Sequence, residues 1–163
     1  MRRWRTSAVM GSVMALAAAG CGGSGGGDSS AERLTKADYQ AKILAVLEDA
    51  SEPTALYTDL VVGPRPRQQC AAGVATLKDQ VGALVDRIAA LRPPAPVQAA
   101  HDDFVEAART SVDRIGTVGE EVADGDVSCG DELNQELYAM PSTKRAERAI
   151  ARIERRGYFV FGE

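Results

Sequence analysis

The sequence predicts an all-α protein, an up-and-down bundle of four to five helices with a central antiparallel hairpin and one disulfide. Apolar residues recur at alternating spacings of three and four, which places them on one face of a helix. Prolines and glycines separate these periodic segments and stop helices between them. Aromatic residues make up only 5% of the chain and alanine is frequent, which suits packed helices better than a sheet.

The first helix is expected to begin at Thr35, because threonine caps helices well and Asp38 then lies in the first turn, where an acid suits the helix dipole. The side chains on its apolar face are Tyr39, Ile43, Val46 and Leu47. Residues 51–53 interrupt this helix. A short second piece over residues 56–61 follows, either as a kinked continuation or as a separate turn, and the prolines of residues 63–66 stop it.

Two long apolar stripes form the clearest pattern in the chain. The first consists of Cys70, Val74, Leu77, Val81, Leu84, Ile88 and Leu91. The second consists of Val97, His101, Phe104, Ala108, Ser111, Ile115, Val118 and Val122. A proline-rich corner at residues 92–96 joins them, so we expect two antiparallel helices. Gly116 and Gly119 weaken the second helix and are expected to permit close helix approach.

Two further helices are expected near the C-terminus. Leu133, Leu137 and Met140 predict a short one, ended by Pro141. Ser142 is expected to cap the last helix, with Gly157 as its stop. The inward residues of that helix are Ala146, Ala149, Ile150 and Ile153. We expect the apolar end of the chain, residues 158–161, to fold back over the bundle.

The N-terminal segment has the pattern of a bacterial lipoprotein signal. Residues 1–20 combine a basic start, a short apolar run and small residues before Cys21, as in a secretory leader. The expected domain organisation is a signal peptide over 1–20, a lipidated Cys21 with a Gly/Ser tether over 21–31, and a helical domain over 32–163. The alternative is an ordinary cleaved signal peptide in which Cys21 carries no lipid.

Cys70 and Cys129 are the cysteines that remain after Cys21. In an exported chain such a pair predicts a disulfide. Cys70 begins one arm of the expected hairpin and Cys129 follows the end of the other arm. Those two ends meet in an antiparallel pair, so the predicted geometry favours the bridge over two free buried thiols.

Charge and composition exclude several classes of function. The formal net charge of −4 falls to about −7 when the three leader arginines are removed. Such an acidic domain is poorly suited to binding nucleic acid, which requires clustered Lys and Arg. His101 is the only histidine, which argues against triad hydrolases and zinc enzymes. No cofactor is expected.

Two groups of acidic residues in the sequence are candidate sites. Asp102 and Asp103 follow His101, but neighbouring residues point about 100° apart on a helix and do not converge. Asp124, Asp126, Ser128 and Asp131 resemble a calcium loop only faintly, because Cys129 and Gln135 replace its glycine and closing glutamate. We therefore interpret His101 as an interfacial residue and the loop as an acidic surface.

The last helix is strongly basic. It carries Lys144, Arg145, Arg148, Arg152, Arg155 and Arg156. Residues 120–136 contain no Lys or Arg at all. The favoured interpretation is that this acidic connection faces the basic helix within the domain. The alternative is a basic amphipathic helix with an aromatic tail that rests on anionic lipid or wall polymer.

Two segments resemble small exported lipoproteins of high-GC Gram-positive bacteria. One is the opening L-T-K-A-D-Y of residues 34–39, and the other is the corner L-R-P-P-A-P of residues 91–96, followed by A-A-H-D. The resemblance covers about half of the chain and implies a helical bundle at the outer face of the membrane, with no implied activity. Such proteins often carry a cysteine in the first helix, which is absent here, so their disulfide pattern does not transfer.

These observations predict a lipid-anchored protein on the extracytoplasmic face of the cell membrane, acting as a non-enzymatic binding or interaction module of the envelope. Its partner would be the membrane together with an envelope protein or a small apolar ligand. A second hypothesis is a carrier of an apolar or amphiphilic ligand, in a pocket lined by Tyr39, Tyr57, Phe104 and His101. A third is an enzyme with a carboxylate site near His101.

Overall fold

The computed structural model describes residues 32–158 and shows an all-α bundle. The expected signal peptide, Cys21, the tether and the chain beyond Tyr158 lie outside the described residues. The part described contains six α-helices and one 3₁₀ turn, which are α1 (Lys36–Glu48), α2 (Ser51–Val62), α3 (Arg67–Ala89), η1 (Ala95–Val97), α4 (Gln98–Asp124), α5 (Asp131–Tyr138) and α6 (Pro141–Glu154).

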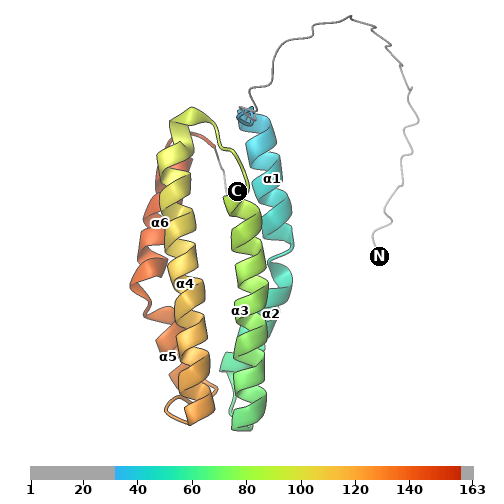
Figure 1. Ribbon diagram of the computed structural model, residues 1–163, viewed down its shortest axis with the longest axis vertical. Helices are drawn as coiled ribbons and strands as arrows, with labels where there is room; N and C mark the ends of the chain where they lie inside the picture. The colour runs from blue at the N-terminus through green and yellow to red at the C-terminus, as the bar shows by residue number, and fades with distance from the viewer. Residues whose placement is uncertain (1–31, 159–163) are drawn as a thin grey trace, which may run out of the picture. The chain divides into compact units, whose positions relative to one another are not determined.

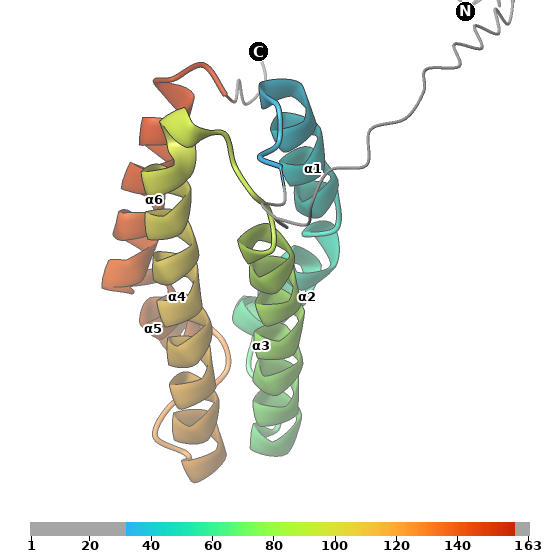
Figure 2. The ribbon, with the colours of Figure 1, turned by 45° about the horizontal axis from the view of Figure 1, so that its top comes forward.

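The six helices form four columns that alternate in direction (Figure 1). α1 and α2 follow one another as one column beside α3, and α5 and α6 form another beside α4. The long helices α3 and α4 make the central pair (Figure 2). The up-and-down bundle predicted from the sequence is therefore confirmed, with two of its four columns each broken into two helices.

The central hairpin buries both predicted stripes. Val74, Val118 and Val122 are fully buried where α3 and α4 cross. Gly119 lies against Val74, because a Cβ added there would come within 3.3 Å of the valine Cγ1. Ala107 of α4 is also fully buried although it lies off the predicted stripe. Because α4 packs against α3 on one side and α6 on another, its buried face is wider than one stripe.

Local chemistry explains where the first two helices begin. The Asp38 N–H donates to Thr35 Oγ1 at 3.2 Å, so Thr35 caps α1 as expected. A turn at Asp49 and Ala50 separates α1 from α2, so the second piece is a helix of its own. Pro53 is accommodated because it stands in the first turn of α2, where no helical partner is required of its nitrogen.

The disulfide between Cys70 and Cys129 is present, with 5.8 Å between the two Cα atoms. It joins the first turn of α3 to the segment that follows α4. Gly125 ends α4 with φ +93°, a left-handed conformation that glycine adopts readily. The reversal at Gly125 brings the chain back toward Cys70, and both sulfurs lie inside the larger core cluster.

Two expectations for α6 are wrong in detail. Ser142 does not cap it, because Pro141 takes the first helical position and no side chain caps the helix. Ser142 is instead buried, and Ser111 Oγ donates to its Oγ at 2.8 Å. The arginines of α6 do not face the acidic connection either. Arg145 and Arg152 pair with α4, because α6 runs beside the first half of α4.

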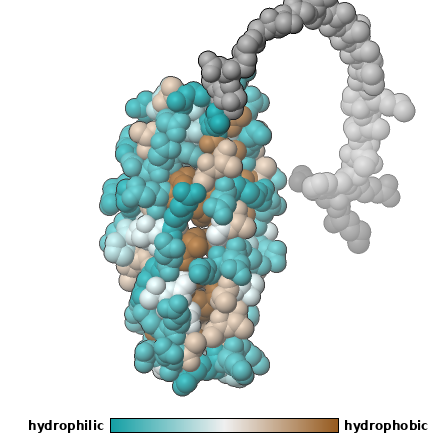
Figure 3. All heavy atoms as spheres, viewed as in Figure 1, coloured by the Kyte–Doolittle hydropathy of each residue, from teal (hydrophilic) through white to brown (hydrophobic). Residues whose placement is uncertain are grey.

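Two core clusters divide the interior. One surrounds the disulfide and includes Leu60, Val74 and Leu133. The other includes Tyr39, Ile88 and Ile153, close to the end where α1 begins. In the view of Figure 1, apolar side chains lie along the middle of the surface between polar ones (Figure 3). Within residues 32–158, no helix has both the length and the apolar character needed to cross a bilayer.

Candidate functional site

An apolar cleft of about 370 Å³ is the first candidate site. It lies where the α1–α2 column and the α5–α6 column face each other across the central hairpin. Leu77 and Ile115 form part of its floor, and both belong to the core cluster around the disulfide. Its remaining lining is Ala50, Pro53, Thr54, Tyr57, Val81, Leu84, Ser111, Leu137, Met140 and Thr143.

The order of packing in the bundle explains the opening. α2 packs on α3 and α6 packs on α4, whereas α1 and α6 are not among the closely packed pairs of the described chain. In a closed four-helix bundle the first and fourth columns would also pack along their length. Here that side is left partly open, and core side chains of α3 and α4 form the floor of the opening.

Few polar side chains line the cleft, and the hydroxyls of Thr54, Tyr57 and Ser111 are already bonded. The Tyr57 hydroxyl donates to Asn134 Oδ1 at 2.5 Å, which links α2 to α5. Ser111 shares its hydroxyl between the Ala107 carbonyl at 3.2 Å and Ser142 at 2.8 Å. The wall of the cleft is therefore predominantly apolar, with hydroxyls at fixed points, as is typical of sites for apolar small molecules.

A second, smaller apolar hollow of about 50 Å³ continues the same helix faces. Leu84 of the larger cleft and Ile88 of the smaller hollow lie one turn apart on α3. α6 likewise contributes Thr143 to the cleft and Ile150 and Ile153 to the hollow. The other residues that line the hollow are Tyr39, Ile43, Leu47 and Phe104. Together the two openings define an elongated apolar path along the bundle.

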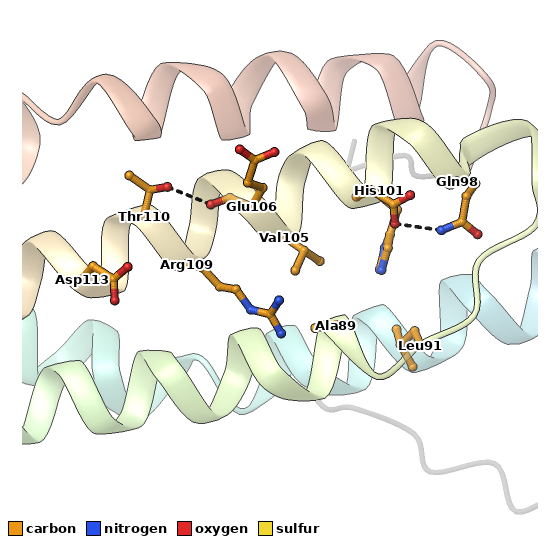
Figure 4. Close-up of a pocket in the computed structure, with 10 residues that line it drawn as sticks. Ala89, Leu91, Gln98, His101, Val105, Glu106, Arg109, Thr110 and Asp113 are labelled. Atoms are coloured by element: carbon orange, nitrogen blue, oxygen red, sulfur yellow. Dashed lines mark hydrogen bonds between the residues drawn. The ribbon is translucent and has the colours of Figure 1, made fainter.

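A polar groove of about 440 Å³ between α3 and α4 is the second candidate (Figure 4). Gln98 Nε2 donates to Asp102 Oδ1 at 2.7 Å at one end of it. Arg109 points from α4 toward α3 and approaches Asp86 to 3.8 Å. The groove is open to solvent, and both Asp102 and Arg109 already have partners, so it offers no obvious place for a buried ligand.

His101 lies at the edge of this groove but is itself buried, with 2% of its surface exposed. Its Nδ1 is 2.9 Å from the Tyr39 hydroxyl oxygen, and one hydrogen bond joins α1 to α4 there. Burial lowers the pKa of His101, against a smaller opposing effect of Asp102. Burial also raises the pKa of Tyr39 to about 12, with smaller contributions from Asp102 and Tyr158. Both groups are thus held neutral.

The carboxylates beside His101 do not form a site with it. Asp102 bonds to Gln98, whereas Asp103 turns toward α6 and accepts a hydrogen bond from Arg152 at 2.6 Å. The three consecutive side chains thus have three different sets of neighbours. Among residues 32–158, no group of three or more His, Cys, Asp or Glu side chains is placed to hold a metal ion.

The four residues of the pocket predicted from the sequence line three different openings in the structure. Tyr57 lines the larger cleft, Tyr39 and Phe104 line the smaller hollow, and His101 borders the polar groove. Sequence reasoning missed the aliphatic floor of the cleft, formed by Leu77, Val81, Leu84 and Ile115. These residues belong to the two apolar stripes, and no signal in one sequence reveals that other helices cover a stripe incompletely.

Comparisons of the chain with models of protein families, with curated proteins and with solved structures give no match.

Proposed function

We propose that the protein is a lipid-anchored envelope protein that binds an apolar or amphiphilic small molecule in the cleft between its two outer helix columns. The observation that carries the proposal is the 370 Å³ opening with a predominantly apolar wall. Sites for small ligands commonly enclose about 300–1,000 Å³, so the volume lies at the lower end of that range. The absence of convergent acid–base groups beside the cleft favours binding over catalysis.

The proposed place of action follows from the N-terminal pattern. Cys21 after a short apolar run and small residues is the point at which a diacylglyceryl group would be attached. Two or more acyl chains would hold the domain to the outer face of the membrane. Mass spectrometry of the processed N-terminus tests this part separately, because an unmodified residue 21 would contradict the anchor and leave the cleft untouched.

Ligand binding is tested by filling the cleft. Val81 lines it from α3, so Val81→Trp should occupy much of its volume. Val62 of α2 is 78% exposed and does not line the cleft, so Val62→Trp is a matched control. Titration with a fluorescent fatty acid, such as cis-parinaric acid, measures the affinity of each purified variant.

The proposal expects saturable binding by the natural chain, a loss of at least about tenfold in affinity for Val81→Trp, and little change for Val62→Trp. Circular dichroism establishes that both variants keep the fold. Equal affinity in all three proteins would exclude the cleft as the site. A similar loss in both variants would show that binding depends on general surface properties.

A further inference from the structure

The distribution of charge sets α6 apart from the rest of the domain. Residues 141–158 carry six Lys or Arg and two Glu, a formal charge of +4. Residues 32–140 carry ten Lys or Arg and nineteen Asp or Glu, a formal charge of −9. The negative net charge of the whole chain thus does not reveal that residues 141–158 are basic.

Three arginines of α6 and the arginine that directly follows it form this surface, which we call the arginine stripe: Arg145, Arg148, Arg152 and Arg155. Their spacing of three and four residues places them on one face of the helix. With Asp103 and Ala151 they line an open surface hollow of about 580 Å³. The stripe is therefore a broad, shallow surface that suits an extended partner better than a small enclosed ligand.

The acids nearby neutralise only part of the stripe. Arg152 pairs with Asp103 at 2.6 Å, and Arg145 pairs with Glu106 at 2.8 Å. Arg148 and Arg155 make no ion pair within residues 32–158. The Nε of Arg152 is buried and has no hydrogen-bond acceptor in the same part of the chain. Arg148 and Arg155, which are both exposed, thus keep their positive charge and hydrogen-bond donors available for an external anion.

The stripe reaches the end of the bundle at which the preceding chain enters. Lys36, in the first turn of α1, lies over the Tyr158 ring with its Nζ 5.3 Å from the ring centre. The end of α6 and the start of α1 are therefore neighbours. Ten residues separate Cys21 from Glu32, and a Gly/Ser-rich chain of that length has an r.m.s. span of roughly 15–20 Å.

We propose that the arginine stripe docks on the phosphate groups of anionic lipids in the membrane that holds the anchor. The proposal rests on the lipid anchor proposed above, since the anchor keeps this end of the bundle close to the bilayer. Basic side chains near such a surface are attracted over about one Debye length, and clusters of them recognise anionic headgroups.

Docking in this way leaves the apolar cleft accessible. Ile150 lies in the smaller hollow, two residues beyond Arg148 and therefore on a nearly opposite side of α6. The stripe and the apolar path thus lie on different sides of the same helix. A docked bundle keeps its ligand site uncovered while it remains at the membrane surface.

Sedimentation with vesicles tests the proposal on chain 22–163, which contains both core clusters and the disulfide. Vesicles of phosphatidylcholine alone are compared with vesicles that also contain phosphatidylglycerol. Binding is expected only with the anionic lipid and should weaken as salt is added. Arg148→Glu with Arg155→Glu should lower the partition coefficient at least about tenfold.

The matched control is Lys78→Glu with Arg109→Glu, which changes the net charge equally on exposed sites of α3 and α4. It should retain most of the binding. Equal losses in the two double variants, equal binding to neutral vesicles, or no vesicle binding would each overturn the proposal. Stripe-dependent binding of soluble polyphosphate without vesicle binding would also overturn it, and would identify a soluble polyanion as the partner.

Titration of the same variants with the fatty-acid probe separates this inference from the proposed function. The stripe variants should bind the probe normally, because the stripe does not line the cleft. Lost vesicle binding with intact probe binding therefore reports on the stripe alone.

Discussion

Burial of the Tyr39–His101 pair couples the protonation of one side chain to the stability of the domain. Burial lowers the pKa of His101 below its ordinary value of 6.5. An exposed histidine in the unfolded chain keeps a pKa near 6.5. Between the folded and unfolded pKa values the unfolded chain binds more protons, so stability falls as the pH drops through that window.

We therefore expect the urea midpoint to fall when the pH is lowered from about 7.5 to 5.5. His101→Asn should reduce that fall, because the amide does not titrate and its oxygen can still accept from the Tyr39 hydroxyl. His101 is the only histidine of the chain, so no other imidazole contributes. A variant with the same pH dependence as the natural chain would contradict this assignment.

Single residues also show where sequence reasoning stops. The Thr35 cap was predictable because its acceptor and donor lie three positions apart in the chain. The hydrogen bond between Tyr39 and His101 was not, because it depends on how α1 packs against α4. Ser142 had the residue type of a cap, but Pro141 before it begins the helix, and the half-buried Ser111 hydroxyl donates a hydrogen bond to Ser142.

At the scale of helices, Ala107 is a small side chain of α4 in the packed interior. Its side chain is fully buried where α4 is covered by other helices. Ala107→Leu should lower the free energy of unfolding by about 1–3 kcal/mol, because added methyl groups have no space in a packed interior.

Ala123 is exposed on the same helix, so Ala123→Leu is the matched control and should change stability by less than about 0.5 kcal/mol. Urea unfolding measures both variants. Equal free energies of unfolding for the two variants would contradict this prediction, and would mean that the residues around Ala107 rearrange to accept a larger side chain.

The disulfide contributes by closing a long loop. Cys70 and Cys129 are 59 positions apart, and the chain-entropy model gives about 4 kcal/mol for a loop of that length. Reduction, or Cys70→Ala with Cys129→Ala, should lower the urea midpoint accordingly. A reduced protein with an unchanged midpoint would show that the unfolded chain is already compact around these residues.

Which helices pair with each other was more predictable than how far one helix is shifted along its neighbour. The two long stripes and the proline corner between them determine the α3–α4 hairpin, and the hairpin places the two cysteines together. The partners of Arg145 and Arg152 depend on which half of α4 lies beside α6, and one sequence does not encode that offset visibly. The open cleft was unpredictable for the same reason. It exists because the α1–α2 column and the α5–α6 column do not pack along their full length, which one sequence does not reveal.

For the whole molecule, the packing predicts unequal stability along the chain. α3 and α4 pack on each other along their length, and α4 also packs on α6, whereas α1 makes few contacts with α3. Amide hydrogen exchange should therefore be faster in α1 than in the middle of α3 and α4. Mass spectrometry of peptic fragments measures this difference, and equal protection of α1 and α4 would contradict it.

The place where the chain enters the bundle determines how the domain would respond to force. A pull transmitted from the N-terminal side reaches the irregular segment before α1, where the Leu34 N–H donates to the Arg92 carbonyl at 2.9 Å and Arg33 Nη1 donates to Gln98 Oε1 at 2.6 Å. Behind those bonds stands only the lightly packed α1. We therefore expect α1 to separate from the bundle first under load. The α3–α4 hairpin, whose open end is closed by the disulfide, should then still keep its fold.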